Sequence, residues 1–398
     1  MSVKEKICFD RTTSFFYYFN IIVGLGPFSY DSKKRIYKKS FKSLAYSWFI
    51  LIMCLCVMPF VLSNYVKKLK TTIRSDFAVS VAILRILLQW ISVIVTALSN
   101  IWLRNQHIFY LNSKKTLNKT ISIKIGTLYR MRYVLLLSLA KLVIFLCRFF
   151  GFYGVMLRVS NFNVIYFILA FITFFPTSIY SINGCNFYME ISSLRFFTFQ
   201  INYCLSQLLK CVQKMPKKLS KAQRMLISCR ISDKIDELSI MYAQLQETLL
   251  ILNNIYATML LLFFTNKLFE WTMQVFLEFI TMTGYSAFHT GSSVFIQNIM
   301  NNIFSIIDVV ITVINCGNFV EEVFIFEQRI PQILHEFPIH KVDDRLRESI
   351  SQFSIQILQR KRPISIYGMF DVDNTLLYSM VTSMTSYLIL LIQFQLGM

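Results

Sequence analysis

Seven apolar stretches, each long enough to cross a lipid bilayer as a helix, constrain the fold of this chain more than any other feature. They run approximately over residues 41–65, 75–103, 131–157, 163–188, 254–280, 293–318 and 375–395. A backbone inside lipid must satisfy its own hydrogen bonds, so these stretches are expected to be helical. The 55% hydrophobic composition and the mean hydropathy of +0.52 agree with this class. We predict an all-α membrane protein with seven transmembrane helices.

The distribution of Lys and Arg predicts which side of the membrane each connection occupies. The N-terminus and the second, fourth and sixth connections between spans carry 31 Lys and Arg residues. The first, third and fifth connections and the C-terminus carry 5. By the positive-inside rule the basic side is cytoplasmic, so the N-terminus is predicted to be cytoplasmic and the C-terminus extracellular. This orientation is the reverse of a G-protein-coupled receptor. The net charge of +20 is explained by topology and predicts no nucleic-acid partner.

The segments between the spans contain further predicted elements. A short apolar patch at residues 15–28, broken by Gly24, Gly26 and Pro27, is expected to be interfacial or re-entrant. Two amphipathic helices are expected outside the membrane, one running into the fifth span and one at residues 343–360. We divide the chain into a cytoplasmic N-terminus (1–40), spans one to four (41–190), a cytoplasmic extension (191–253), spans five and six (254–318), cytoplasmic helices (319–370) and the last span (371–398).

The last span carries its polar residues on one face. Ser379, Ser386 and Gln393 recur every seven residues, and Ser383 and Leu390 fall on the same side of a helix. The opposite side is oily and consists of Leu377, Met380, Met384, Leu388 and Leu391. Hydroxyls and an amide at membrane depth need protein partners or water. The stripe therefore indicates either a pore-lining helix in an oligomer or a polar seam within one chain, and periodicity alone favours the seam.

The end of this span matches a known pattern. Residues Ser386 to Phe394 read as a hydroxyl residue, Tyr, five hydrophobic residues, Gln and Phe. This closely resembles the C-terminal signature of insect gustatory receptors, which are related to insect odorant receptors. The run from Gly368 to Leu377 resembles that family's approach to its last helix, and Val23 to Phe28 resembles its N-terminal patch. Ser386 stands where the family usually has Thr, so the hydroxyl is kept.

The resemblance implies a tetrameric ligand-gated, nonselective cation channel with a central pore. In such channels the last helix lines the pore, and the positions of Gln393 and Leu390 narrow it. The same resemblance implies packing roles for Tyr387 and Phe394, and an intersubunit anchor in the cytoplasmic residues 319–370. The implied partners are a small-molecule tastant, permeant cations, the bilayer and other gustatory receptors in a homo- or hetero-tetramer. The implied location is the plasma membrane, in dendrites of chemosensory neurons.

Ionisable residues at membrane depth suggest where a ligand binds. Lys267, Glu270 and Gln274 lie three or four residues apart on one face of the fifth span, and Arg148 lies near the middle of the third. We expect Arg148 or Lys267 to pair with Glu270. The remaining candidate ligand contacts are Gln274, Trp271, Tyr153 and Tyr166. A buried structural ion pair needs the same residues and stays an equal alternative.

No motif in the chain indicates an enzyme, a cofactor or a metal site. His335 and His340 are separated by five residues with Pro338 between them, so they cannot share a helix face as in a zinc protease. The run from Asp371 to Asn374 lacks the Gly and Glu of a calcium loop and is better explained as a helix cap. The alternatives to a taste receptor are an odorant-type or pheromone receptor, a secondary transporter and a metabotropic receptor. The aromatic pocket favours bitter or other small organic ligands.

Overall fold

The computed structural model describes residues 14–15, 17–31, 33–34, 36–72, 76–125, 164–213, 220–282, 343–358 and 365–396, with scattered positions in 136–147 and 299–314. The helices are α2 (Phe41–Thr72), α3 (Asp76–Trp102), α4 (Arg104–Lys124), α6 (Val164–Gln213), α7 (Lys221–Met282), α9 (Asp344–Leu358) and α10 (Asn374–Leu396). The strands are β1 (Phe28–Asp31), β2 (Ile36–Lys39), β3 (Ser365–Ile366) and β4 (Phe370–Asp371). The predicted helical class is therefore confirmed, with two small hairpins that the sequence did not predict.

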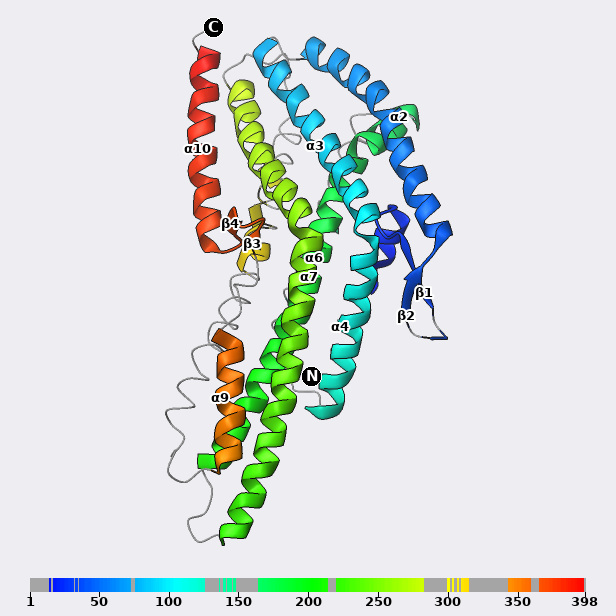
Figure 1. The fold of residues 1–398 in the computed structure, drawn as a ribbon. Coiled ribbons are helices and arrows are strands. Elements are labelled where there is room, and N and C mark those ends of the chain that lie inside the picture. Colours follow the sequence, from blue (N-terminus) through cyan, green and yellow to red (C-terminus); the bar gives the residue numbers. More distant parts are fainter. Residues whose placement is uncertain are drawn as a thin grey trace.

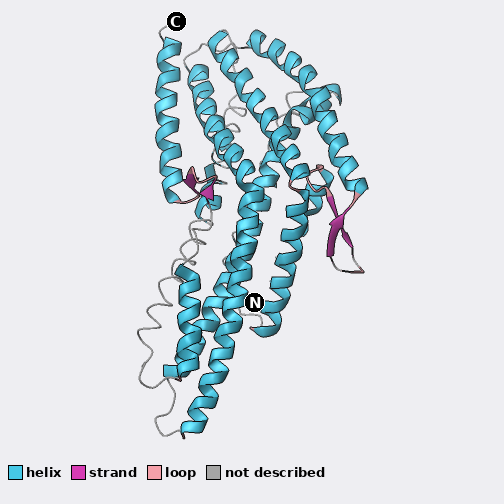
Figure 2. Cartoon of the chain, viewed as in Figure 1, coloured by secondary structure: helices cyan, strands magenta, loops and turns pink. Residues whose placement is uncertain are grey.

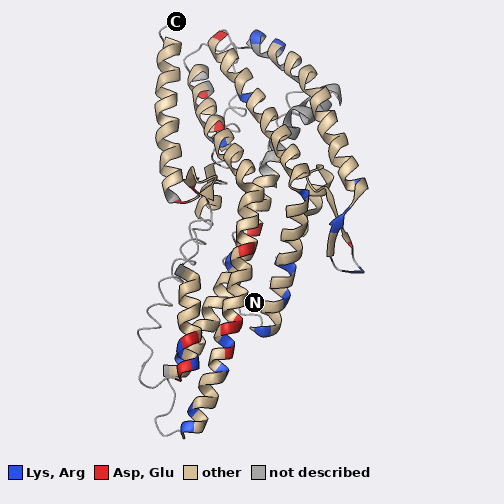
Figure 3. Cartoon of the chain, viewed as in Figure 1, with Lys and Arg blue, Asp and Glu red and all other residues tan. Residues whose placement is uncertain are grey.

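The helices form an elongated bundle around α7, which runs along most of its length (Figure 1). The C-terminal ends of α2, α7 and α10 and the N-terminal end of α3 lie at one end of the bundle (Figure 1). The first half of α7 and α9 lie at the other end (Figures 1 and 2). Charged residues are dense in the half that holds α9 and α4 and sparse in the half that holds α10 (Figure 3). The sparsely charged half is the part that suits a bilayer.

Four of the described helices are long and apolar enough to cross a membrane. These segments are Phe41–Phe60, Asp76–Trp102, Lys221–Ile280 and Thr375–Leu396. They contain or coincide with most of the predicted first, second, fifth and seventh spans. The predicted fourth span starts α6, which continues as helix to Gln213. The predicted third and sixth spans, 131–157 and 293–318, fall largely outside the described residues.

The first half of α7 is amphipathic and continues without a break into the apolar half, as the sequence predicts. Its repeating apolar residues, Ile231, Ile235, Leu238, Met241 and Leu245, are all buried. Helix α9 covers this face with its own apolar side, and polar pairs fix the register between them. Ser232 and Ser349 share a hydrogen bond of 2.6 Å, Arg345 pairs with Asp233, and Ser239 donates to Gln356.

Helix α6 contacts α7 closely where a glycine removes the side chain. A Cβ at Gly184 would lie 2.7 Å from Cε2 of Phe263 on α7, so only glycine fits this crossing without a shift. Further along α6, Glu190 accepts hydrogen bonds from Tyr110 and Lys114 of α4. Burial and the neighbouring Glu190 carboxylate hold the pKa of the Tyr110 phenol well above its ordinary value. These contacts fix α4, α6 and α7 as one core.

The N-terminal patch folds back onto the bundle. Val23 and Leu25 are buried among residues of α3 and α6, and the chain turns at Gly24, whose φ of +82° suits glycine. The chain then forms the antiparallel β1–β2 hairpin, which pairs Phe28 with Lys39 and Asp31 with Ile36. Val23, Leu25 and Phe28 of this patch thus contribute to the core of the protein.

A second hairpin leads into α10. Strands β3 and β4 join through Tyr367, Gly368 and Met369. Tyr367 and Gly368 have positive φ, and the Met369 N–H donates to the Ile366 carbonyl at 2.9 Å, which closes a tight turn. Asn253 of α7 donates to the Ser365 carbonyl at 2.8 Å, which ties the hairpin to α7. Asp373 then caps α10, because its Oδ1 accepts from the Thr375 backbone N–H at 2.9 Å. The predicted cap is confirmed.

Candidate functional site

The polar stripe of α10 lies on a side of the helix that the rest of the chain leaves open. Ser379, Ser386, Leu390 and Gln393 are exposed, and Ser383 is half-buried. The opposite side packs inward, where Met380 is 4% exposed and Leu388 and Leu391 contact apolar residues of α3 and α7. The stripe is therefore not a seam between the described helices of one chain.

The serine hydroxyls of the stripe bond to their own helix. Ser379 donates to the Thr375 carbonyl at 2.9 Å, and Ser386 donates to the Thr382 carbonyl at 3.0 Å. A hydroxyl that donates its only proton to the backbone still has lone pairs to offer. The stripe thus presents hydroxyl oxygens as acceptors, with the Gln393 amide near the C-terminal end of α10. Such a surface suits water or a cation better than it suits lipid.

The two motif residues predicted to pack have different surroundings. The Phe394 ring is 54% exposed and lies 6.0 Å from the Phe77 ring of α3, measured between ring centroids. The Tyr387 ring is 57% exposed in this single chain. Phe394 therefore has a ring partner within the chain, whereas the described helices leave the Tyr387 ring exposed, and its predicted packing role stays a prediction.

The predicted ion pair on the fifth span forms between two residues of α7. Lys267 Nζ lies 2.9 Å from Glu270 Oε2, and the Lys267 side chain is fully buried. Of the two cations predicted to pair with Glu270, the structure places Lys267 beside it. Arg148 lies outside the described residues. A buried pair one helical turn apart compensates two charges that lipid would otherwise reject.

The other predicted ligand contacts are only partly brought together. Trp271 is 4% exposed and Gln274 is half-buried, both on α7. Tyr153 and the side chain of Tyr166 lie outside the described residues. The sequence reasoning missed Asn266, which donates to Ser92 of α3 at 2.5 Å directly beside the ion pair. An amide next to a lysine in an apolar span was the signal that could have identified it.

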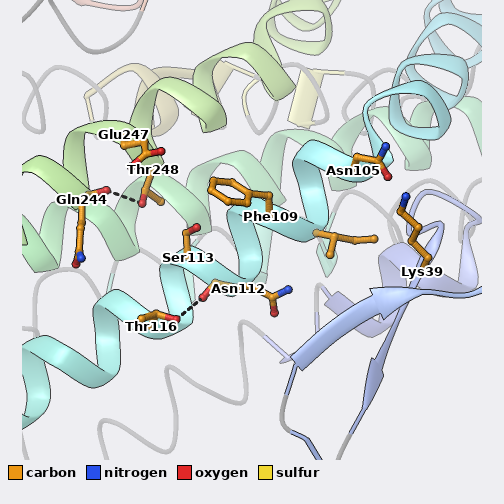
Figure 4. A pocket seen from close by; sticks show the side chains of 10 residues that line it. Lys39, Asn105, Phe109, Asn112, Ser113, Thr116, Gln244, Glu247 and Thr248 are labelled. Atoms are coloured by element: carbon orange, nitrogen blue, oxygen red, sulfur yellow. Dashed lines mark hydrogen bonds between the residues drawn. The ribbon is translucent and has the colours of Figure 1, made fainter.

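A cavity of about 570 Å³ lies elsewhere, between β2, α4 and α7 (Figure 4). It is lined by Lys39, Asn105, Ile108, Phe109, Asn112, Ser113, Thr116, Gln244, Glu247 and Thr248. None of the predicted ligand-binding residues contributes to it. The cavity belongs to the charged half of the bundle, on the side predicted to face the cytoplasm.

The fold contains four helices that could cross a membrane, and a family comparison identifies the class of protein. The family model of the 7tm chemosensory receptors matches residues 13–398. Because this match covers nearly the whole chain, the chain belongs to the chemosensory receptor family. A segment of 48 residues is 51% identical to a Drosophila melanogaster protein named as gustatory receptor 2a. That segment spans 12% of this chain and only 11% of the Drosophila protein.

Solved structures show the same fold. The insect olfactory receptor OR5 from Machilis hrabei superposes with a TM-score of 0.63 and 13% sequence identity, covering 97% of each chain. The same receptor in complex with eugenol gives a TM-score of 0.59 and 15% identity over 98% of this chain and 99% of that chain. At this level of identity the comparison establishes the architecture alone.

Proposed function

We propose that this chain is a gustatory receptor, a subunit of a tetrameric, ligand-gated, nonselective cation channel in the plasma membrane of chemosensory neurons. The observation that carries the proposal is the exposed polar stripe of α10, on a helix whose apolar side is already used by its own subunit. One helix cannot enclose water, but four copies around an axis would turn their stripes into the wall of a pore. The family membership supports this use of the stripe.

In the proposed pore, each position has a physical role. A ring of Leu390 side chains closes the pore by excluding water when the helices approach one another. Gln393 offers amide dipoles to a passing cation, and the serine oxygens replace part of its hydration shell. Without a ring of charged side chains on this stripe, the pore would discriminate weakly among small cations.

The proposed topology has seven spans with the N-terminus in the cytoplasm and the C-terminus outside. It is supported by the count of 31 against 5 basic residues and by the concentration of charge at one end of the bundle (Figure 3). With this orientation Gln393 lies at the extracellular end of α10. The cytoplasmic half, with α9 packed on α7, would form the anchor between subunits.

Two features support the gustatory branch over an odorant-type or pheromone receptor. The Gln-Phe ending of the C-terminal motif resembles gustatory receptors, and the 48-residue match is to a protein of that name. The ligand is a small organic compound, and the aromatic character of the predicted pocket favours a bitter one. We place the ligand beside Trp271 and Gln274 in the outer half of the bundle, with Lys267 and Glu270 as the buried pair behind them.

The proposal is tested by whole-cell current in a heterologous cell that expresses this chain and receives a broad panel of tastants. We expect a ligand-evoked cation current that persists when G-protein turnover is blocked. Gln393→Ala should change the relative permeability of the cations, and Leu390→Ala should increase the current without ligand. Ile389→Ala is the matched control, because Ile389 is an exposed apolar residue next to Leu390 but off the stripe.

The outcome that would overturn the pore assignment is a ligand-evoked current whose permeability and leak are the same in all four proteins. A current that requires G-protein turnover would favour a metabotropic receptor. Ligand-dependent uptake of a substrate without channel current would favour a secondary transporter.

A further inference from the structure

The junction between the β1–β2 hairpin, α2 and α4 is strongly basic and lies where the apolar part of α2 begins. Lys33, Lys34, Lys39 and Lys42 are exposed around this junction. Lys38 pairs with Asp31, the acidic residue of the hairpin, at 3.0 Å. Hydrogen bonds from Lys38 and from the backbone of Lys34 and Lys33 hold the pKa of Asp31 below its ordinary value. The junction therefore keeps a net positive charge.

Hydrogen bonds to α4 hold this basic hairpin in place. Asn112 accepts from the Tyr37 backbone N–H at 2.9 Å and donates to the Tyr37 carbonyl at 3.1 Å. Arg104 donates to the Ser40 carbonyl at 2.9 Å, just before α2 starts. Lys39 is thus presented from a fixed strand towards Asn105 on α4 (Figure 4).

Exposed aromatic residues mark the level at which a membrane surface would lie. Phe41 begins α2 and is 82% exposed, and Trp102 ends α3 and is 88% exposed. Trp and other amphipathic rings gather at the boundary between lipid headgroups and hydrocarbon. Lys39, Lys42 and Asn105 are each within three residues of one of these two aromatics. The basic end of the cavity consequently lies at headgroup level.

We infer that the cavity between β2, α4 and α7 binds the headgroup of an anionic phospholipid from the cytoplasmic leaflet, with its phosphate at Lys39 and Asn105. This rests on the proposed orientation of the chain, since anionic lipids concentrate in that leaflet. Lys39 supplies an ammonium donor and Asn105 an amide N–H donor, and both hydrogen bonds are charge-assisted because the phosphate acceptor is ionised. Lys42 adds positive charge on the side of the cavity that faces the membrane.

The far end of the cavity determines which anionic headgroup fits. Glu247 of α7 lines that end, opposite Lys39 (Figure 4). Its carboxylate repels a headgroup that carries several phosphates and tolerates one with a single net charge. The site therefore prefers phosphatidylserine to a polyphosphorylated inositol lipid.

The test measures lipid retained by the full-length protein after assembly in nanodiscs that contain phosphatidylserine and phosphatidylcholine in both leaflets. We expect phosphatidylserine to be enriched around the wild type. The enrichment should fall about fivefold in Lys39→Gln/Lys42→Gln. It should persist in Lys67→Gln/Lys70→Gln, a control that removes the same charge from exposed positions at the other end of α2. Asn105→Leu, which keeps every lysine, should reduce enrichment about threefold.

Three results would overturn the inference. Equal loss in both double variants would mean that surface charge alone attracts the lipid. Full enrichment in Asn105→Leu would show that the lipid does not bind in the cavity. Displacement of the lipid by soluble inositol hexakisphosphate would show that the cavity binds a cytosolic phosphate compound instead. Phosphatidylcholine retention and elution volume show whether each variant is folded. The assay needs neither current nor tastant, so its failure is distinct from failure of the channel proposal.

Discussion

Helices α7 and α10 both have the length and hydropathy of a membrane span, but they differ in how much of their surface is buried. Half of the most apolar part of α7 is buried within the subunit, compared with 6% of the corresponding part of α10. Helix α7 contacts α3, α4, α6, α9 and α10, whereas α10 lies at the edge of the bundle (Figure 1). Helix α7 organises the described bundle, and α10 presents a surface that the other described helices leave uncovered.

Their polar residues differ in the same way. On α7 the charged and amide groups face partners within the chain, as in the contacts of Lys267 with Glu270 and of Asn266 with Ser92. On α10 Ser386 bonds only within its own helix, and Gln393 is exposed. These polar groups of α7 thus hold helices together, whereas Ser386 and Gln393 of α10 lie on the exposed surface of the described bundle. Substitutions should separate these two roles.

The largest effect is expected from Lys267→Met on α7. Removing one partner of a buried ion pair leaves the Glu270 carboxylate in an apolar region, at a cost of about 3–5 kcal/mol in the free energy of unfolding. Thermal unfolding of the purified protein in detergent measures this loss. Lys221→Met, at the exposed start of the same helix, is the control and should change stability little.

The double variant Lys267→Met/Glu270→Leu sharpens this prediction. Replacing both charges by apolar groups of similar size should recover most of the lost stability. If Lys267→Met unfolds at the wild-type temperature, the buried pair is not part of what holds α7 in the bundle.

The next effect is expected where α6 crosses α7. Gly184→Ala places a methyl group 2.7 Å from the Phe263 ring carbon, and overpacking of this kind costs about 1–3 kcal/mol. Gly184→Ala/Phe263→Leu relieves the contact and should restore part of the melting temperature. If Gly184→Ala is as stable as the wild type, the crossing of α6 and α7 can accommodate a methyl group without a shift.

Acid should destabilise the half of the bundle that holds α4 through His107 of that helix. Its ring stacks against Phe28 and lies edge-on to Tyr256, and desolvation lowers its pKa to about 4. Because the unfolded chain binds this proton at higher pH, stability falls as the pH decreases from about 6.5 towards 4. Melting curves across this range should be flatter for His107→Asn. Identical pH profiles for the wild type and His107→Asn would show that His107 does not cause the loss of stability in acid.

A smaller effect is expected at the start of α10. Asp373→Ala removes the acceptor for the Thr375 and Leu376 backbone N–H groups and should cost about 1 kcal/mol. Asp373→Asn keeps the acceptor oxygen and should cost less. A melting temperature that is unchanged in Asp373→Ala would show that the hairpin, not the cap, fixes where α10 begins.

The smallest effect on stability is expected on the stripe itself. Gln393→Ala removes an exposed amide that the subunit does not need for packing, so unfolding should shift by no more than about 0.5 kcal/mol. A large loss of stability in the isolated subunit would mean that Gln393 holds the bundle together, as the groups of α7 do.

The sequence predicted α3, α7 and α10 well because hydrophobic length and periodicity are local properties, but it missed α4 and the continuation of α6 to Gln213. The bounds of α3 and α10, the continuity of α7 and the burial of its repeating apolar residues followed from pattern alone. The Asp373 cap followed from residue type next to an apolar run. These features depend on neighbours within a few turns of the same helix.

Contacts between distant segments could not be predicted in this way. Nothing local in the sequence places Lys39 beside Asn105, or Asn266 beside Ser92, because each pair depends on how helices pack. The sequence left both Arg148 and Lys267 as partners for Glu270, and geometry was needed to place Lys267 there. The hairpins were missed because two-residue strands such as β3 are too short to give a periodic signal.

The central claim, that the stripe of α10 faces water in a pore, is tested most directly by substituted-cysteine accessibility. Ser386→Cys, Leu390→Cys and Gln393→Cys would each be exposed to a charged methanethiosulfonate reagent during ligand-evoked current, with the wild type controlling for native cysteines. We predict irreversible loss of current in all three and no change in Ile389→Cys, which lies off the stripe. Modification of Ile389→Cys with no effect at the three stripe positions would contradict the claim and place the conduction path elsewhere.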